Sequence, residues 1–172
     1  MNKRIRKKQT KLHNKYLCER YPFLIPRHIW TDKVMWEVPK SDWRYTPKYS
    51  YTLLDSMPQG WRKVFGEQMC KEIREELIKW NYLDKYRISQ IKEKYGELRW
   101  YDFGVPKNSK IWDIIDKYSE MSQHICLCCG RPAEIISNGG WLEPICNSCL
   151  KQQELKNKQW LKKFEKERNV QG

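Results

Sequence analysis

The feature that most constrains this chain is a pair of C-x-x-C motifs in residues 126–149, CLCCGRPAEIISNGGWLEPICNSC. The pairs are Cys126 with Cys129 and Cys146 with Cys149, and sixteen residues separate them. This separation is typical of a four-cysteine zinc site. A tight turn within each pair lets both sulfurs face one ion, and four Zn–S bonds of about 2.3 Å complete a tetrahedron. The spacing therefore predicts Zn²⁺ as a structural cofactor held by these four thiolates.

Glycines placed beside the motifs favour a zinc ribbon over residues 124–150. Gly130 follows Cys129, where the turn of a cysteine knuckle usually needs a positive φ. Residues 138–140, Asn-Gly-Gly, supply a reversal that returns the second knuckle to the first.

Other roles for these cysteines fit the sequence less well. Disulfides are disfavoured because seven is an odd count and no signal peptide precedes them. An iron–sulfur cluster also uses four thiolates and stays an alternative to zinc. Ordinary buried cysteines would rarely have this spacing by chance. Cys128 or His124 could replace a ligand, although the Cys126–Cys129 pair fits the turn best and leaves Cys128 as a spare thiol. A catalytic zinc usually keeps one position open for water, so four cysteines indicate a structural site.

Charge is concentrated at the two ends of the 172-residue chain. Residues 1–20 hold eight Lys or Arg against one Glu, and residues 151–172 hold seven against three acidic residues. Only +2 of the net charge of +13 is left for the middle. Basic ends can bind phosphate backbones by releasing counterions, although an acidic protein surface or a mere solubility role is also compatible. The terminal candidates for binding nucleic acid or a protein partner are Lys3, Arg4, Arg6, Lys7, Lys8, Lys11, Lys158, Lys162 and Lys163.

The sequence predicts an α+β fold, a helix–β-hairpin–helix body with a C-terminal zinc ribbon and basic terminal segments. We expect a basic flexible arm over 1–15, the body over 16–123, the ribbon over 124–150 and a basic helix or tail over 151–172. The arm is too polar to bury a face and is expected to be disordered or conditionally helical.

Hydrophobic patterning gives the order of elements inside the body. Prolines make 21–26 an extended strap, and 27–57 is expected to be irregular with a short strand near 49–53. Residues 58–80 form a helix, 86–103 a β-hairpin turning near Gly96, 109–122 a second helix, and 150–168 a basic helix. The apolar stripe expected for the first helix comprises Trp61, Phe65, Met69, Ile73 and Leu77, widened by Val64 and Ile78. The second helix is expected to have its cap at Asn108 or Ser109.

Two stretches carry a resemblance. IKEKYGELRWYD at 91–102 and CGRP…GGWLEPICNSC at 129–149, together with 51–70, resemble small uncharacterised proteins of phages and prophages of low-GC Gram-positive bacteria. The resemblance covers most of residues 15–150 and implies a mobile-element origin and a zinc site, without a family activity to transfer. No apolar stretch follows the positively charged start of the sequence, so we expect an intracellular protein, in the cytoplasm of a bacterial host, where reducing conditions preserve thiolates. No apolar run is long enough for a membrane span, so no membrane partner is expected.

Catalytic patterns are weak, and we do not expect an enzyme. The chain has three histidines, no G-x-S-x-G motif and no Gly-rich phosphate loop. A metal-dependent nuclease would need carboxylates around Mg²⁺ at the hairpin, but these are equally the polar face of a strand pair. The candidates are Asp84, Glu93, Glu97 and Asp102.

Aromatic and basic residues on the hairpin suggest a second binding surface. Lys92, Lys94 and Arg99 could form a basic face, and Trp100 beside Arg99 is the best candidate for stacking on a base, although core packing is the commoner role of such a residue. Trp141 is expected to pack over the zinc module.

Two functions remain open on the sequence. The first is a zinc-binding, nucleic-acid-binding accessory or regulatory protein. The alternative is a phage-type inhibitor that blocks a host nucleoprotein machine, such as a restriction or CRISPR effector or a polymerase. The sequence leaves the oligomeric state, the kind of nucleic acid and any target protein undetermined.

Overall fold

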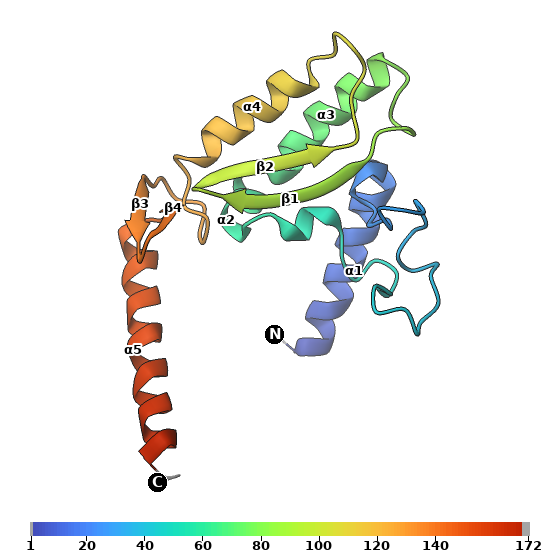
Figure 1. The fold of residues 1–172 in the computed structure, drawn as a ribbon. Coiled ribbons are helices and arrows are strands. Elements are labelled where there is room, and N and C mark those ends of the chain that lie inside the picture. The colour runs from blue at the N-terminus through green and yellow to red at the C-terminus, as the bar shows by residue number, and fades with distance from the viewer. Residues whose placement is uncertain (1, 170–172) are drawn as a thin grey trace.

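Two helices cover one face of a β-hairpin in the body of the protein (Figure 1). The computed structural model describes residues 2–169. The helices are α3 (Glu67–Lys79) and α4 (Ile111–Ser122), and the hairpin is β1 (Ile88–Lys94) with β2 (Glu97–Asp102). A second hairpin and a long C-terminal helix follow, which confirms the predicted α+β class. No helix within residues 2–169 combines the length and the hydropathy needed to cross a membrane.

The helical segment before α3 is continuous with it, as the sequence predicted. It comprises α2 (Gln59–Trp61), a single π-helical turn η3 (Arg62–Gly66) and then α3. All five residues of the predicted stripe are buried: Trp61, Phe65, Met69, Ile73 and Leu77. Val64 and Ile78 are about half exposed, so the widened stripe is wrong. Each lies one residue from the stripe, and one residue turns the side chain by about 100° around the helix.

The first hairpin has the predicted turn. Tyr95 and Gly96 form a two-residue loop with φ values of 58° and 81°, the positive values that a type I′ turn requires. Ile91 pairs with Trp100 on the face that meets the helices, and Lys92 pairs with Arg99 on the opposite face. Trp100 is 4% exposed, and its Nε1 donates a hydrogen bond to the Tyr86 hydroxyl at 3.0 Å. Trp100 is therefore a core residue and is not available for stacking.

Helix α4 begins at Ile111, two residues after the predicted start, and uses a long-range cap instead of Asn108 or Ser109. The buried Glu76 carboxylate of α3 accepts hydrogen bonds from the Lys110 backbone N–H and from Trp80 Nε1, both at 3.0 Å. The other end of α4 is tied to β2, because Ser122 Oγ accepts the Leu98 backbone N–H at 2.8 Å.

The basic N-terminal segment is helical, and its helix runs across the expected boundary at residue 15. Helix α1 (Lys3–Arg20) starts at Asn2, whose side chain accepts the Arg4 backbone N–H. Its last turns bury Asn14, Leu17 and Cys18, and packing against the body fixes the helix that the polar sequence alone does not favour.

The segment after α1 buries its apolar residues but is not the predicted extended strap. It forms a 3₁₀ turn, η1 (Pro22–Leu24), with Tyr21 and Phe23 in the core. Residues 25–52 are irregular, as expected. The predicted strand near 49–53 is wrong, because η2 (Leu53–Ser56) begins there and Asp55 Oδ2 accepts the Thr52 backbone N–H at 2.6 Å.

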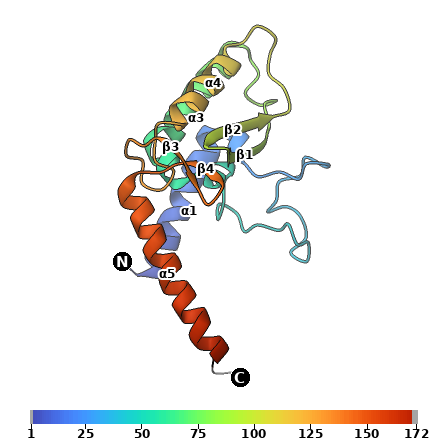
Figure 2. The ribbon, with the colours of Figure 1, turned by 60° about the vertical axis from the view of Figure 1, so that its left-hand side comes forward.

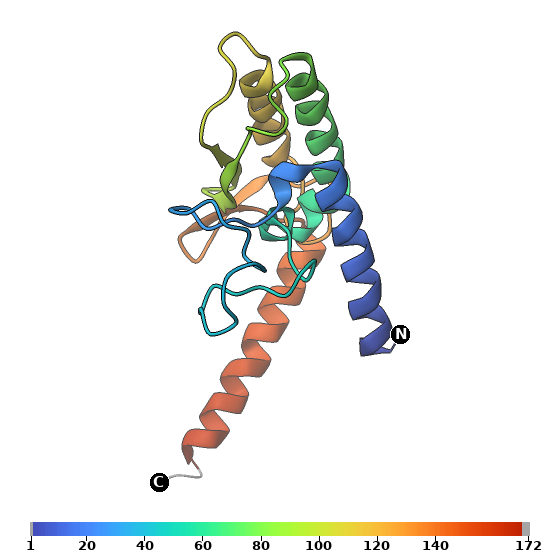
Figure 3. The same ribbon diagram turned by 90° about the vertical axis from the view of Figure 1, so that its right-hand side faces the viewer.

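Two basic helices extend from the same side of the body. Helix α5 (Asn147–Asn169) begins inside the second cysteine pair, three residues earlier than predicted. It and the N-terminal half of α1 both point away from the hairpin layer in Figure 1. The two helices cross in the view of Figure 2 and spread apart toward their free ends in Figure 3.

Candidate metal centre

The four cysteines of the two C-x-x-C motifs meet at one point between the second hairpin and α5. The sulfurs of Cys126, Cys129, Cys146 and Cys149 all lie within 4.8 Å of one another. Cys129 Sγ and Cys146 Sγ are 3.7 Å apart, close to the edge of about 3.8 Å that a tetrahedron with 2.3 Å Zn–S bonds has. All are free thiols rather than disulfides. The group could therefore hold a metal ion.

The first knuckle is a hydrogen-bonded turn. Gly130 N–H donates to the Cys126 carbonyl at 2.9 Å, and Cys126 N–H donates to the Arg131 carbonyl at 2.7 Å. Gly130 has φ of 82°, the positive value that the sequence predicted. A side chain at Gly130 is also excluded by space, because a Cβ there would lie 2.6 Å from Val64 Cγ2.

The second knuckle joins a β-ribbon to α5. Strands β3 (Ile135–Asn138) and β4 (Trp141–Pro144) pair around Gly139 and Gly140, both at positive φ, as the predicted reversal requires. Cys146 follows β4, and Cys149 lies in the first turn of α5. The two knuckles are linked because Leu127 N–H donates to the Pro144 carbonyl at 2.9 Å.

Hydrogen bonds connect the cysteine group to the body through α2, at the start of the helical segment that continues into α3. Gly60 N–H donates to the Leu127 carbonyl at 2.8 Å, and Trp61 Nε1 donates to the Ile125 carbonyl at 2.7 Å. Sequence reasoning assigned Trp61 to the core and overlooked Gly60. A glycine inside the first turn of a helix, where it weakens the helix, was the available signal.

The surroundings of Cys129 and Cys146 favour thiolates, whereas those of Cys149 favour the thiol unless a cation is bound. Arg131 Nε donates to Cys129 Sγ at 3.3 Å, and this contact lowers the pKa of Cys129 to about 6. A backbone hydrogen bond from Cys149 lowers the pKa of Cys146. Burial raises the pKa of Cys149 to about 12, because a thiolate there would be desolvated among other thiols. A metal cation would remove that penalty, since thiolates bind metals and thiols do not.

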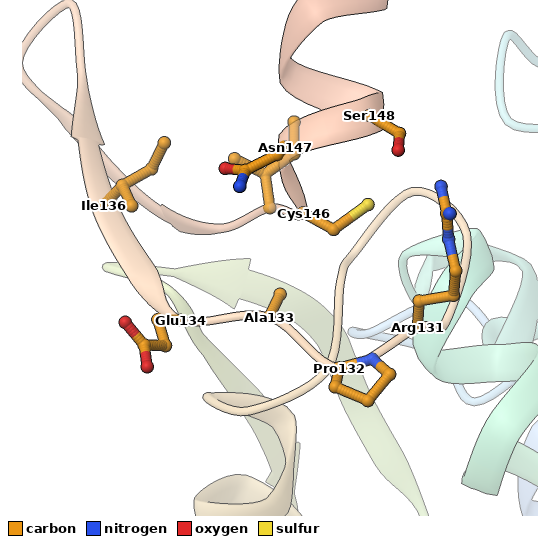
Figure 4. Close-up of a pocket in the computed structure, with 9 residues that line it drawn as sticks. Arg131, Pro132, Ala133, Glu134, Ile136, Cys146, Asn147 and Ser148 are labelled. Carbon is orange, nitrogen blue, oxygen red and sulfur yellow. The ribbon is translucent and has the colours of Figure 1, made fainter.

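An open hollow of about 570 Å³ lies beside the knuckles (Figure 4). In Figure 4 the Cys146 sulfur points toward the loop that carries Arg131, while Glu134 lies on the far side of the hollow. The hollow contacts a single ligand of the group, Cys146. Because all four ligand positions are cysteines, a bound metal would have no position left for water, as in structural sites.

The two alternative ligands lie outside the group. Cys128 Sγ is 3.9 Å from Gln153 Nε2 and is not among the four clustered sulfurs. His124 contributes its backbone carbonyl, which accepts the Ala133 N–H at 3.0 Å. Cys128 is the spare thiol that the turn geometry indicated.

No family model, curated protein or solved structure matches this chain.

The predicted basic residues occupy three separate surfaces. Residues Lys3 to Lys11 are exposed on α1, and Lys158 and Lys162 are exposed on α5. The side chain of Lys163 lies outside the described residues. Lys92, Lys94 and Arg99 share the outer face of the first hairpin, where Arg99 pairs with Glu97 at 3.0 Å.

The carboxylates proposed for Mg²⁺ are not gathered into a site. Glu93 accepts the Gly96 backbone N–H at 2.6 Å, and Asp102 accepts the Tyr86 hydroxyl at 3.1 Å. Glu97 accepts the Ser119 hydroxyl at 2.6 Å. Within residues 2–169, the cysteine group is the one place where three or more metal-ligating side chains meet.

The prediction that Trp141 packs over the zinc module is wrong. Its side chain is 78% exposed and does not pack over the metal centre. It lies directly after the Gly139-Gly140 turn, and it lines a cavity together with Lys94 and Tyr95 at the tip of the first hairpin.

Proposed function

We propose that this protein is a zinc-stabilised, nucleic-acid-binding accessory or regulatory protein of phage or mobile-element origin. Four cysteines at tetrahedral spacing without an open position are the usual ligand set of structural Zn²⁺. Iron–sulfur binding is the competing chemistry, and metal analysis with an absorption spectrum separates the two. Free thiolates and a zinc centre suit the reducing cytoplasm of a bacterial host.

The observation that carries the nucleic-acid proposal is the placement of the two basic helices. Helices α1 and α5 hold most of the excess positive charge, and both extend from the same side of the body (Figure 1). The lysines of both helices whose side chains the structure describes are exposed rather than buried in ion pairs with the core. Two cationic helices on one side can neutralise phosphates on a single nucleic acid at two places, which raises affinity through counterion release.

The resemblance of residues 91–102 and 129–149 to phage and prophage proteins supports the proposed origin. It does not distinguish DNA from RNA. The choice between them is left to the binding experiment.

The experiment is fluorescence anisotropy of zinc-loaded protein with duplex DNA, single-stranded DNA and RNA at two salt concentrations. We expect affinity to fall steeply with salt, with a slope of log K against log [salt] of about −0.9 for each duplex phosphate contact. Affinity that is unchanged between low and moderate salt would contradict the proposal.

The matched variant replaces basic residues of α1 by glutamine, which keeps helix propensity and removes charge. The changed residues are Lys3, Arg4, Lys7, Lys8 and Lys11, all of them exposed. We expect weaker binding and a shallower salt slope at unchanged thermal stability. Deleting the segment through residue 15 is a poor test, because Asn14 is fully buried and its loss would disturb the core.

One observation favours the second candidate, an inhibitor that binds a host nucleoprotein machine. The distal part of α5 exposes Trp160, Leu161 and Phe164 on one side, and the Trp160 and Phe164 rings stack at 5.3 Å. An apolar patch on a projecting basic helix suits a protein groove. Host proteins retained from nuclease-treated lysate by the wild type, and lost with Trp160→Ala/Phe164→Ala, would favour this candidate.

A further inference from the structure

The tip of the first hairpin lies against β3 of the second hairpin, and an open cavity lies beside this contact. Gly96 of the first turn approaches Ile135 of β3 so closely that a Cβ would be 3.0 Å from Ile135 Cδ1. A cavity of about 440 Å³ opens beside this contact. Its lining residues are Glu93, Lys94, Tyr95, Gly140, Trp141 and Leu142. Its volume is in the range of about 300–1,000 Å³ that is typical of small-ligand sites.

Two aromatic side chains at this cavity are exposed without contributing to the core. Tyr95 is 66% exposed and Trp141 is 78% exposed. Tyr95 also occupies the first position of a type I′ turn at φ of 58°, where Asn, Asp or Gly is preferred. A bulky residue in this conformation is uncommon, and such outliers gather at functional sites. Tyrosine is therefore a poor choice for the turn itself, but at this position its ring lines the cavity.

Cations accompany these rings along the outer face of the first hairpin. Lys94 Nζ lies 5.0 Å from the centre of the Tyr95 ring, and Lys92 Nζ lies 5.3 Å from that of Tyr101. Alternating aromatic and basic side chains suit single-stranded nucleic acid, because bases stack on the rings while the cations meet the phosphates. A purely apolar peptide would gain nothing from the lysines.

We propose that this cleft binds one unpaired nucleobase of single-stranded nucleic acid, stacked on Trp141 and Tyr95, with Lys92 and Lys94 on the flanking phosphates. The inference rests on the proposed nucleic-acid function and specifies its ligand. The Trp141 indole is the larger platform, and the open cavity leaves both rings accessible from solvent. Because every base has a π-face, we expect little dependence on base identity.

The test uses full-length, zinc-loaded protein with fluorescein-labelled oligo(dT), an abasic strand of equal length and a duplex. The variants are Trp141→Ala and Tyr95→Asn, and the control is Trp30→Ala, whose side chain is 84% exposed on a different segment. Tyr95→Asn puts a preferred residue into the turn, so a loss of binding by this variant is not explained by a weaker hairpin.

We expect both cleft variants to weaken oligo(dT) binding about 5- to 100-fold, the usual effect of removing one stacking side chain. Binding of the abasic strand and of the duplex, and all binding by Trp30→Ala, should stay within about twofold of wild type. If the cleft variants bind oligo(dT) normally while wild type shows salt-dependent binding, the cleft proposal fails and the proposed function survives. An equal loss on the abasic strand also overturns it. If wild type binds none of the three, both proposals fail.

Discussion

Gly60 and Cys126 are in such close contact that a Cβ built on Gly60 would lie 2.0 Å from the Cys126 carbonyl oxygen. Real Cβ atoms do not approach a backbone oxygen this closely, and neither backbone segment can yield as a flexible side chain would. Helix α2, which continues into η3 and α3, therefore holds the first cysteine knuckle against the body. The metal centre and the α+β body form one packed unit at this contact.

The first prediction concerns this contact. Gly60→Ala should force the knuckle away from the helix and lower stability by about 1–3 kcal/mol, the range for overpacked sites. We expect a lower melting temperature and weaker zinc retention against a chelator. Gln59→Ala, at an exposed neighbouring position, is the control and should match wild type. A Gly60→Ala protein with wild-type melting and zinc content would show that the contact is unimportant.

The second prediction assigns the ligands. Cys146→Ser should lose zinc and thermal stability together, because thiolate–metal binding is coupled to folding of the module. Cys128→Ser should retain one zinc per chain and wild-type stability, because its sulfur is outside the cluster. Zinc content from elemental analysis and melting curves provide the two measurements. A Cys128→Ser protein that cannot bind zinc would overturn this assignment.

The third prediction concerns the acid side of the stability profile. Hydrogen bonding from the Lys110 backbone N–H, then from Lys79 and Trp80, holds the pKa of Glu76 at about 2. A free glutamate has a pKa of about 4.3, so the stabilisation is complete above that value and is lost as pH falls toward 2. Glu76→Gln should therefore be less stable than wild type at pH 7, and the difference should vanish near pH 2.

Melting temperatures of both proteins between pH 7 and 2 test this. Acid release of zinc should lower both curves and largely cancel in their difference. A constant difference across the range would mean that the Glu76 charge contributes nothing to stability.

The fourth prediction separates stability from function at the first hairpin. Asn tolerates the left-handed conformation better than Tyr, so Tyr95→Asn should stabilise the fold by up to about 1 kcal/mol. Denaturant unfolding measures the change. Tyr95→Ala serves as the comparison, because it removes the ring without supplying a preferred turn residue and should not stabilise. Destabilisation by Tyr95→Asn would mean that the ring supports the fold through packing.

Short-range spacing in the sequence determined several parts of this protein. The two C-x-x-C pairs with their glycines predicted a cluster of four cysteines, and the structure brings these sulfurs within 4.8 Å. The four-residue period from Trp61 to Leu77 predicted a buried helix face, and Tyr95-Gly96 between strand-like segments predicted a hairpin turn. The helix face and the turn depend on residues that are neighbours along the chain or within one or two turns, so local geometry suffices. The cysteine cluster depends on two short motifs separated by sixteen residues, a spacing that the chain can close with one hairpin.

Tertiary structure decided the parts that depend on which surfaces meet. Asn14 belongs to a strongly basic segment that looks disordered, yet it is buried because the body accepts the last turns of α1. Trp100 and Trp141 both lie in strands close to a turn, yet one is in the core and the other is exposed on a cleft. A strand pattern gives alternation but not the side that will be covered. The Gly60 contact likewise joins residues more than sixty positions apart, and only packing of the ribbon on the body brings them together.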